Sequence, residues 1–360
     1  MNLRDAAVGR DNNFNLLRMV AATAVLVSHS FAIHSGDARQ EPLKGAVGVG
    51  LGGLAVDVFF VASGFLVTAS MVKRGSVADF IRARAYRIYP AAVVVCLLTV
   101  FVLGPAVTTV ELSRYFSASA TWEYLAKCST FIAGVSFNLP GVFESNPFAA
   151  TVNGSLWSMR WELRCYALLV VFWVVAGWLG SRRAAWYERT VVAVAIGALV
   201  MATVQRITPV LPNLPIGLLG MFMVGGAMHV FADRIALPRW GGPVALLAIM
   251  VAGAASPTAF ALTWMLAAPY LVLWCAYVPG GPIRAYNRVG DYSYGVYLYA
   301  FPVQQLLIML APEIGILPYT LLTFAIVLGF AALSWHFIEK RWLRSGHGAS
   351  RRRVVPTPAG

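Results

Sequence analysis

The sequence has little charge and few cysteines. Only 12% of its 360 residues are Asp, Glu, Lys or Arg, whereas roughly a quarter is usual in soluble domains. The four cysteines are scattered without a C-x-x-C pair, so they predict neither a metal site nor a disulfide framework. We also find no internal repeat and no low-complexity tract. These absences exclude a soluble globular domain and argue against a transporter built from repeated halves.

Hydrophobic residues are abundant instead, at 59% of the chain with a mean hydropathy of +0.70. Apolar runs long enough for a membrane helix of about 20 residues recur along the chain. Because hydrocarbon requires each backbone group to be paired within its own segment, these runs are expected to be helices. The sequence therefore predicts an all-α, polytopic membrane protein with about ten spans. We place them near 16–35, 52–72, 90–108, 164–180, 190–206, 214–232, 242–257, 258–278, 293–312 and 316–337.

The net charge of +13 is explained by orientation. With the N-terminus in the cytoplasm, most of the 28 Lys and Arg residues fall on inner segments, such as 73–87 and 182–189. This skew follows the positive-inside rule and needs no nucleic-acid partner. It predicts a cytoplasmic (inner) membrane protein with both termini cytoplasmic. We expect one membrane domain over residues 1–345 and a disordered basic tail over residues 346–360, facing anionic lipid.

Two further segments bear on the topology. The start "MNLRDAAVGRDNNFN" is mostly polar and predicts no cleavable signal. The long external segment, residues 109–160, contains the apolar stretch "STFIAGVSF". That stretch is too short to cross a membrane. We therefore expect residues 129–140 to be re-entrant or interfacial.

Polar residues inside spans are costly, so each one suggests a function. Arg18 and His29 are eleven residues apart on the first span, about three turns, and so share a face. Asp57 is expected at the depth of His29, where a carboxylate could hold the imidazole in one tautomer. The alternatives are an Arg18 that reaches the headgroups, a His29 that only packs, and an Asp57 that faces water.

Two more groups of polar residues are candidates for a functional role. In "FIRARAYRIYP", Arg84 and Arg87 are three residues apart, and their guanidinium groups match phosphate oxygens. Positive-inside charge alone would also explain them. In "NGSLWSMRWELRCYALL", Glu162 lies among aromatic residues that could be an interfacial belt. Ser63 is interpreted first as a small residue at a close helix contact.

These motifs together resemble the acyltransferase-3 family of integral membrane O-acyltransferases, over nearly the whole chain. The first span is similar to the family's helix with an arginine and a histidine eleven residues later. "AVDVFFVASGFLVT", "RARAYRIYPA" and "NGSLWSMRWELRCY" resemble its next three motifs, in the same order. "YSYGVYLYAFPVQ" and "SWHFIEKRW" look like the last two helices. The chain departs from the pattern at Met19 and at Asn153-Gly154-Ser155, where many members have a histidine before the tryptophan.

The resemblance implies transfer of an acyl group, most often acetyl from cytoplasmic acetyl-CoA, to a hydroxyl of an extracytoplasmic carbohydrate or glycolipid. It implies catalytic roles for His29, Asp57 and Glu162, and donor binding by Arg84, Arg87 and Arg18. His29 would act as general base or carry the acyl group itself. The expected partners are membrane lipids, acyl-CoA and the acceptor, and no metal is expected. A proton-coupled transporter or flippase is the alternative function.

Overall fold

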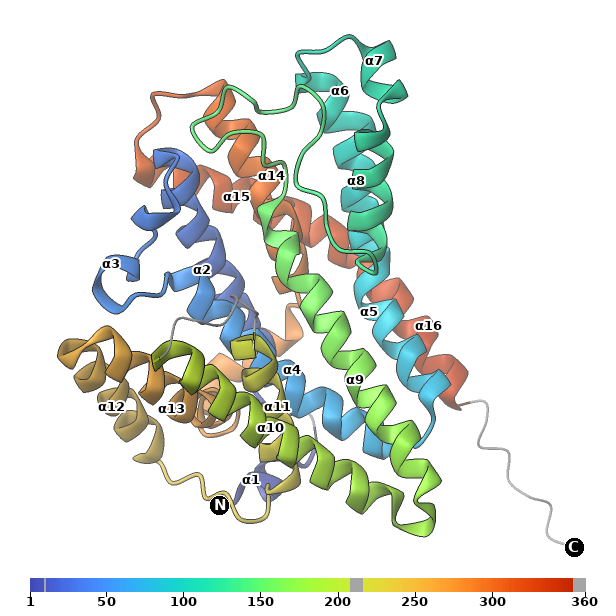
Figure 1. Cartoon of the computed structure of the whole chain (residues 1–360), viewed down its shortest axis with the longest axis vertical. Helices are drawn as coiled ribbons and strands as arrows, with labels where there is room; N and C mark the ends of the chain where they lie inside the picture. Colours follow the sequence, from blue (N-terminus) through green and yellow to red (C-terminus); the bar gives the residue numbers. More distant parts are fainter. Residues whose placement is uncertain (10, 208–215, 352–360) are drawn as a thin grey trace, which may run out of the picture. The chain divides into compact units, whose positions relative to one another are not determined.

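The structure is a computed structural model that describes residues 1–9, 11–207 and 216–351. Its contacts separate into two compact units. Unit 1 comprises Met1–Lys73 and Trp161–Ser293, and unit 2 comprises Arg74–Arg160 and the described residues from Tyr294 on. Both are helical (Figure 1), and a single isolated β-bridge, between Asn2 and Ala236, interrupts this pattern in the described residues. The predicted all-α class is confirmed.

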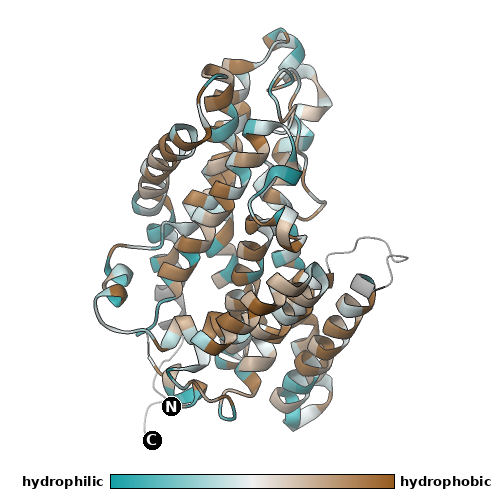
Figure 2. Cartoon of the chain, turned by 90° about the vertical axis from the view of Figure 1, so that its left-hand side faces the viewer, coloured by the Kyte–Doolittle hydropathy of each residue, from teal (hydrophilic) through white to brown (hydrophobic). Residues whose placement is uncertain are grey.

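The predicted spans coincide with helices, and only residues 214 and 215 of the span 214–232 lie outside the described residues. Within the described residues, seven helical stretches are long and apolar enough to cross a membrane, and two shorter apolar helices accompany them. A further helix, α14 (Ser293–Leu310), covers the remaining predicted span. Hydrophobic residues dominate these helices in Figure 2. The polytopic architecture is therefore confirmed, with roughly nine to ten spans.

Unit 1 contains most of the predicted spans. Its helix α9 begins at Met159, two residues before the unit 1 segment that starts at Trp161. In chain order its elements are α1 (Leu3–Ala6), α2 (Phe14–Ser35), η1 (Ala38–Gln40), α3 (Lys44–Val47), α4 (Leu51–Arg74), α9 (Met159–Trp178), η4 (Gly180–Arg182), α10 (Arg183–Ile207), α11 (Ile216–Val230), α12 (Gly241–Ala255), α13 (Pro257–Tyr277) and η5 (Gly281–Arg288).

Local sequence explains where α12 ends and α13 begins. Ser256 breaks the helix in an extended conformation, and its hydroxyl accepts a hydrogen bond from the backbone N–H of Ala259. Pro257 then occupies the first turn of α13, where its missing N–H costs nothing. The two helices pack side by side (Figure 1). The short break between the two helices is thus a capped helix start.

Glycines bring α4 and α11 into backbone contact. A Cβ atom at Gly64 would lie 1.9 Å from the carbonyl oxygen of Phe222, and one at Gly225 would lie 2.2 Å from that of Val61. No side chain larger than hydrogen fits at either position. Small residues allow such close approach between membrane helices, and this crossing fixes the middle of α4, where Ser63 lies.

Unit 2 is built around α5, which continues through a π-helical turn. In chain order its elements are α5 (Val77–Leu98), η2 (Thr99–Leu103, π-helical), α6 (Gly104–Val107), α7 (Leu112–Ser117), α8 (Ser119–Thr130), η3 (Gly154–Ser158), α14, α15 (Ile316–Ser334), η6 (Trp335–Glu339, π-helical) and α16 (Lys340–Arg351). Both α8 and α16 pack against α5 (Figure 1).

The apolar stretch within 129–140 does not form a spanning helix. Helix α8 ends at Thr130, and residues 131–153 contain no helix or strand. Gln305 of α14 holds this segment, because its side-chain amide donates to the carbonyl oxygens of Phe148 and Thr151, both at 2.7 Å. This agrees with the expectation that residues 129–140 do not cross the membrane.

A proline in α14 creates a buried acceptor that the same segment satisfies. Pro302 has no N–H, so the carbonyl of Leu298, four residues earlier, lacks its helical donor. The Asn153 side chain donates to that carbonyl oxygen at 3.0 Å, in a buried position. Asn153 stands where the family resemblance would favour a histidine, and its amide here serves the backbone of α14.

The C-terminal end is helical further than the sequence indicated. Helix α16 runs to Arg351, beyond the expected start of a disordered tail at residue 346. Residues 352–360 lie outside the described part of the chain. The assignment of residues 1–345 to one membrane domain stays a prediction.

Candidate active site

His29 lies in α2 about two turns before the helix ends at Ser35. It is partly buried, between the buried residues Ser28 and Ser30. Ser30 donates back to the carbonyl of Leu26 within the helix, at 3.0 Å. The predicted histidine is therefore in unit 1, in a polar stretch of an otherwise apolar helix.

Asp57 has a specific partner in the same unit. The indole Nε1 of Trp264, on α13, donates to Asp57 Oδ2 at 2.9 Å. The Trp264 ring stacks on Phe260 with 5.9 Å between ring centroids. The carboxylate thus accepts a hydrogen bond from a helix 207 residues further along the chain, which a carboxylate that faces only water would not do.

Glu162 lies at the centre of a hydroxyl cluster. Ser63 of α4 donates to Glu162 Oε1 at 2.9 Å, and the Tyr166 hydroxyl donates to the same oxygen. The two hydroxyl oxygens are 3.0 Å apart. Ser63 and Tyr166 are both buried. One carboxylate oxygen therefore receives two neutral donors, an arrangement through which protons can be exchanged.

Arg18 is engaged in an ion pair. Its Nη1 lies 3.5 Å from Oδ2 of Asp291, whose side chain is only 8% exposed. Ser293 donates to the other carboxylate oxygen of Asp291. The Asp291 charge also acts on Tyr286, whose pKa is raised first by burial and then by this carboxylate. Because a buried acid holds its guanidinium, Arg18 does not simply reach toward headgroups.

Arg87, in unit 2, is likewise paired with a buried acid. Its Nη1 lies 3.6 Å from Oε2 of Glu339, which is 2% exposed. Ser334 donates to the other oxygen of Glu339 at 3.0 Å. The Arg87 guanidinium lies over the ring of Tyr294, with its Cζ 5.5 Å from the ring centroid. Glu339 belongs to the π-helical turn η6, and π-helical turns often occur at functional positions.

Arg84 differs from Arg87 in its hydrogen bonding. Its Nε is buried and has no hydrogen-bond partner among the described residues. The nearby Arg82 contacts Asp79 at 4.0 Å. A buried guanidinium N–H without an acceptor is costly. Of the two arginines expected to bind phosphate, Arg84 has the N–H that a ligand oxygen could satisfy.

The structure thus places His29, Asp57, Glu162 and Arg18 in unit 1, and Arg84 and Arg87 in unit 2. Sequence reasoning did not find the partners Trp264, Asp291 and Glu339. A signal for Glu339 was present, because it is an acid near the end of a predicted span. No local signal indicates that Trp264 serves as a donor.

Comparisons with known proteins identify the class. The family model described as an acyltransferase domain, acyltransferase-3, matches residues 11–337. The chain belongs to the acyltransferase-3 family. It is 30% identical to the O-acetyl transferase of Shigella phage Sf6, over 93% of this chain and 96% of that protein. It is also 30% identical to Nodulation protein 10 of Rhizobium leguminosarum bv. viciae, over 96% of this chain and 97% of the relative. No solved structure matches it.

The predicted class is therefore confirmed. This acyltransferase-3 protein is a multi-pass membrane O-acyltransferase, which sets aside the transporter or flippase alternative. An acyl transfer of this kind needs an acetyl donor and a hydroxyl acceptor.

Proposed function

We propose that this protein moves an acetyl group from acetyl-CoA in the cytoplasm to a hydroxyl of an extracytoplasmic carbohydrate or glycolipid. The Glu162–Ser63–Tyr166 cluster carries the proposal, because it holds a carboxylate among hydroxyl donors inside a membrane helix bundle. The name of the phage relative, an O-acetyl transferase, supports acetyl as the acyl group.

The proposed chemistry assigns a step to each group. His29 removes the proton of the acceptor hydroxyl, and the oxygen attacks the thioester carbonyl carbon. The carbon–sulfur bond breaks, and the thiol of coenzyme A leaves with a proton. In the alternative sequence, His29 first takes the acetyl group and then passes it to the hydroxyl. Glu162 binds or activates the acceptor hydroxyl, and Asp57 orients the imidazole.

Donor binding is assigned to the arginines. Guanidinium groups form forked hydrogen bonds with phosphate oxygens, so Arg84 and Arg87 suit the phosphates of acetyl-CoA. The free Nε of Arg84 supports this role for Arg84 most directly. Arg87 would be held in one orientation by its ion pair with Glu339. The family resemblance assigns Arg18 to donor binding as well.

The function is tested by supplying acetyl-CoA to the purified protein in detergent. We expect release of free coenzyme A that speeds up with a hydroxyl acceptor. Mass spectrometry of cell-surface glycans, with and without the protein, should then show an acetyl group on one of them. A protein that neither consumes acetyl-CoA nor changes any surface glycan would refute the proposal.

The orientation proposed for the mechanism puts both termini in the cytoplasm, as the charge distribution favours. Single cysteines test it, in a background without the four native ones. Ser145 and Ala78 are exposed sites on predicted opposite sides. In intact cells an impermeant thiol reagent should label Ser145→Cys, and Ala78→Cys only after lysis. The reverse labelling pattern would mean that the protein has the opposite orientation in the membrane.

A further inference from the structure

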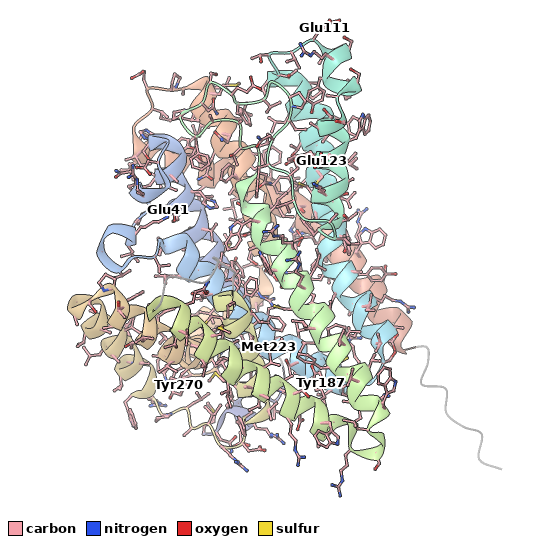
Figure 3. All side chains as sticks on the ribbon, viewed as in Figure 1. Glu41, Glu111, Glu123, Tyr187, Met223 and Tyr270 are labelled. Carbon is pink, nitrogen blue, oxygen red and sulfur yellow. The ribbon has the colours of Figure 1, made fainter. Side chains whose placement is uncertain are left out.

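The segment that joins α2 to α4 places the carboxylate of Glu41 against α2, the helix that carries His29. Glu41 follows η1 on this segment, where Figure 3 labels it, and its side chain is half-buried. The hydroxyl of Ser28 donates to Glu41 Oε2 at 2.8 Å. Ser28 is fully buried and directly precedes His29. A charged group outside the predicted spans therefore reaches the residue next to the proposed base.

Two glycines make room for this contact. A Cβ atom at Gly50 would lie 2.0 Å from Glu41 Oε2, so any side chain there would displace the carboxylate. A Cβ at Gly52 would lie 3.1 Å from the Ser28 hydroxyl oxygen. Both glycines are at the start of α4, where backbone N–H groups favour a negative charge. The start of α4 thus accommodates the Glu41 carboxylate against α2.

The backbone around Glu41 is held in an unusual conformation. Leu43 has a φ of +73°, which is uncommon for a residue with a side chain. The N–H of Lys44 donates to the carbonyl of Glu41 at 3.1 Å, and that of Leu51 donates to the carbonyl of Pro42 at 2.8 Å. A strained residue persists only where its surroundings fix it. The hydrogen bonds on either side of Leu43 supply that constraint.

The same segment also connects to Asp57. Val47 of α3 packs in an apolar cluster with Leu54 and Phe260, and Trp264 packs against that cluster. Trp264 is the residue whose indole donates to Asp57. Residues 36–50 therefore contact the helix of His29 at one point and the support of Asp57 at another, all within unit 1.

Asp37, in the same segment, is a half-buried carboxylate whose side chain contacts a neighbouring residue, because it accepts from the backbone N–H of Arg39 at 2.8 Å. It pairs with Arg39, whose side chain is 87% exposed, at 3.0 Å. The hydrogen bond from the Arg39 guanidinium is the largest of the effects that lower the pKa of Asp37. Glu41 lies four residues away and instead accepts a hydrogen bond from a buried hydroxyl of a membrane helix. Asp37 therefore contacts a residue of its own segment, whereas Glu41 contacts helix α2.

We propose that Glu41 is a positioning residue for the acyl transfer. By accepting the Ser28 hydroxyl, it fixes the last turns of α2 against the start of α4, and so holds His29 at one level and rotation. This inference rests on the proposed role of His29. Glu41 acts on His29 through the hydrogen bond from Ser28. An acceptor oxygen at position 41 therefore matters more than the negative charge of the carboxylate.

The variants separate the hydrogen bond from the charge. Glu41→Ala and Ser28→Ala should each lower kcat about 10-fold, because small misplacement of a reacting group is costly. Ser28→Ala/Glu41→Ala should be no worse than either alone, since both remove one interaction. Glu41→Gln keeps an acceptor oxygen and should retain kcat within about threefold, whereas Glu41→Asp, one methylene shorter, should behave like Glu41→Ala. The KM for acetyl-CoA should not change.

Asp37→Asn is the matched control, since it removes a half-buried carboxylate of the same segment but keeps an oxygen that can accept from the backbone N–H of Arg39 at the start of η1, and it should retain wild-type kcat. Thermal denaturation in detergent checks that each variant is folded. Additive losses in the double variant, full activity in Glu41→Ala, or a loss of kcat in Asp37→Asn equal to that in Glu41→Ala would each overturn the inference. An inactive wild-type protein would instead refute the proposed function, so the two failures are distinguishable.

Discussion

The half-buried carboxylate of Glu162 in unit 1 and the buried carboxylate of Glu339 in unit 2 have different partners. In unit 1, Glu162 accepts from the hydroxyls of Ser63 and Tyr166, which are neutral. In unit 2, Glu339 faces the positive guanidinium of Arg87. Unit 1 also contains an ion pair, between Arg18 and Asp291. Glu162 and Asp57, which accept hydrogen bonds from neutral side chains, therefore differ from the two acids that are paired with arginines.

The difference separates two uses of a carboxylate within a membrane protein. An ion pair cancels charge in a low-dielectric interior and is disrupted when either partner is removed. A carboxylate with hydroxyl donors has no such cancellation, so its charge is expensive in a membrane and indicates function. We therefore expect catalytic effects from changes at Glu162 and effects on folding from changes at Glu339.

The largest effect is expected at His29. His29→Gln keeps a polar side chain of similar size but removes the base, so transfer should fall at least about 100-fold, within the range for general acid–base catalysis. The measurement is acetyl transfer at equal expression in membranes. Wild-type transfer by this variant would return His29 to a packing role and remove the basis for assigning proton transfer to unit 1.

A somewhat smaller loss is expected in the hydroxyl cluster. Glu162→Gln should lower kcat about 100-fold and Tyr166→Phe about 10-fold, because the first removes the carboxylate and the second one donor to it. Tyr187→Phe is the control, since Tyr187 is a fully buried tyrosine of the same unit that packs on Trp173. Steady-state assays should leave its kcat unchanged. Equal losses at Tyr166 and Tyr187 would mean that the cluster only supports the fold.

The two arginines of unit 2 should differ from one another. Arg84→Lys loses the forked donor and should raise the KM for acetyl-CoA about 10-fold without affecting folding. Arg87→Gln leaves Glu339 buried without its cation, which costs about 3–5 kcal/mol. Thermal denaturation should show that loss, and Arg87→Gln/Glu339→Gln should recover part of it.

Arg182→Lys, at an exposed position of η4, is the control for the arginine variants and should change neither KM nor stability. If Arg84→Lys and Arg182→Lys shared one KM for acetyl-CoA, Arg84 would be no more than a signal of membrane orientation.

The smallest effect is expected at Asn153, where stability changes and catalysis does not. Asn153→Ala leaves the carbonyl of Leu298 buried without a donor, at a cost of about 1–3 kcal/mol. Denaturation in detergent should detect it, while the transfer rate per folded molecule stays the same. A drop in that rate at unchanged stability would place this part of unit 2 in the reaction.

Much of the fold and part of the site could be predicted from sequence. Apolar runs located each span because a membrane forces them into helices. Residues such as His29 and Glu162 stood out because polar groups are rare there. Ser63 did not, since a serine at a close helix contact looks like any small residue. Its role as a donor to Glu162 appears only once α4 and α9 are placed together.

The sequence by itself therefore determined the class of protein, the positions of its membrane helices and the residues that suggest acyl transfer. Tertiary structure alone decided the partners: Ser63 with Glu162, Asp57 with Trp264, and Arg18 with Asp291 are 99, 207 and 273 residues apart. The physical reason is range. Hydropathy acts on each segment separately, whereas a hydrogen bond forms only between groups about 3 Å apart, and only the packing of the helices brings such groups together.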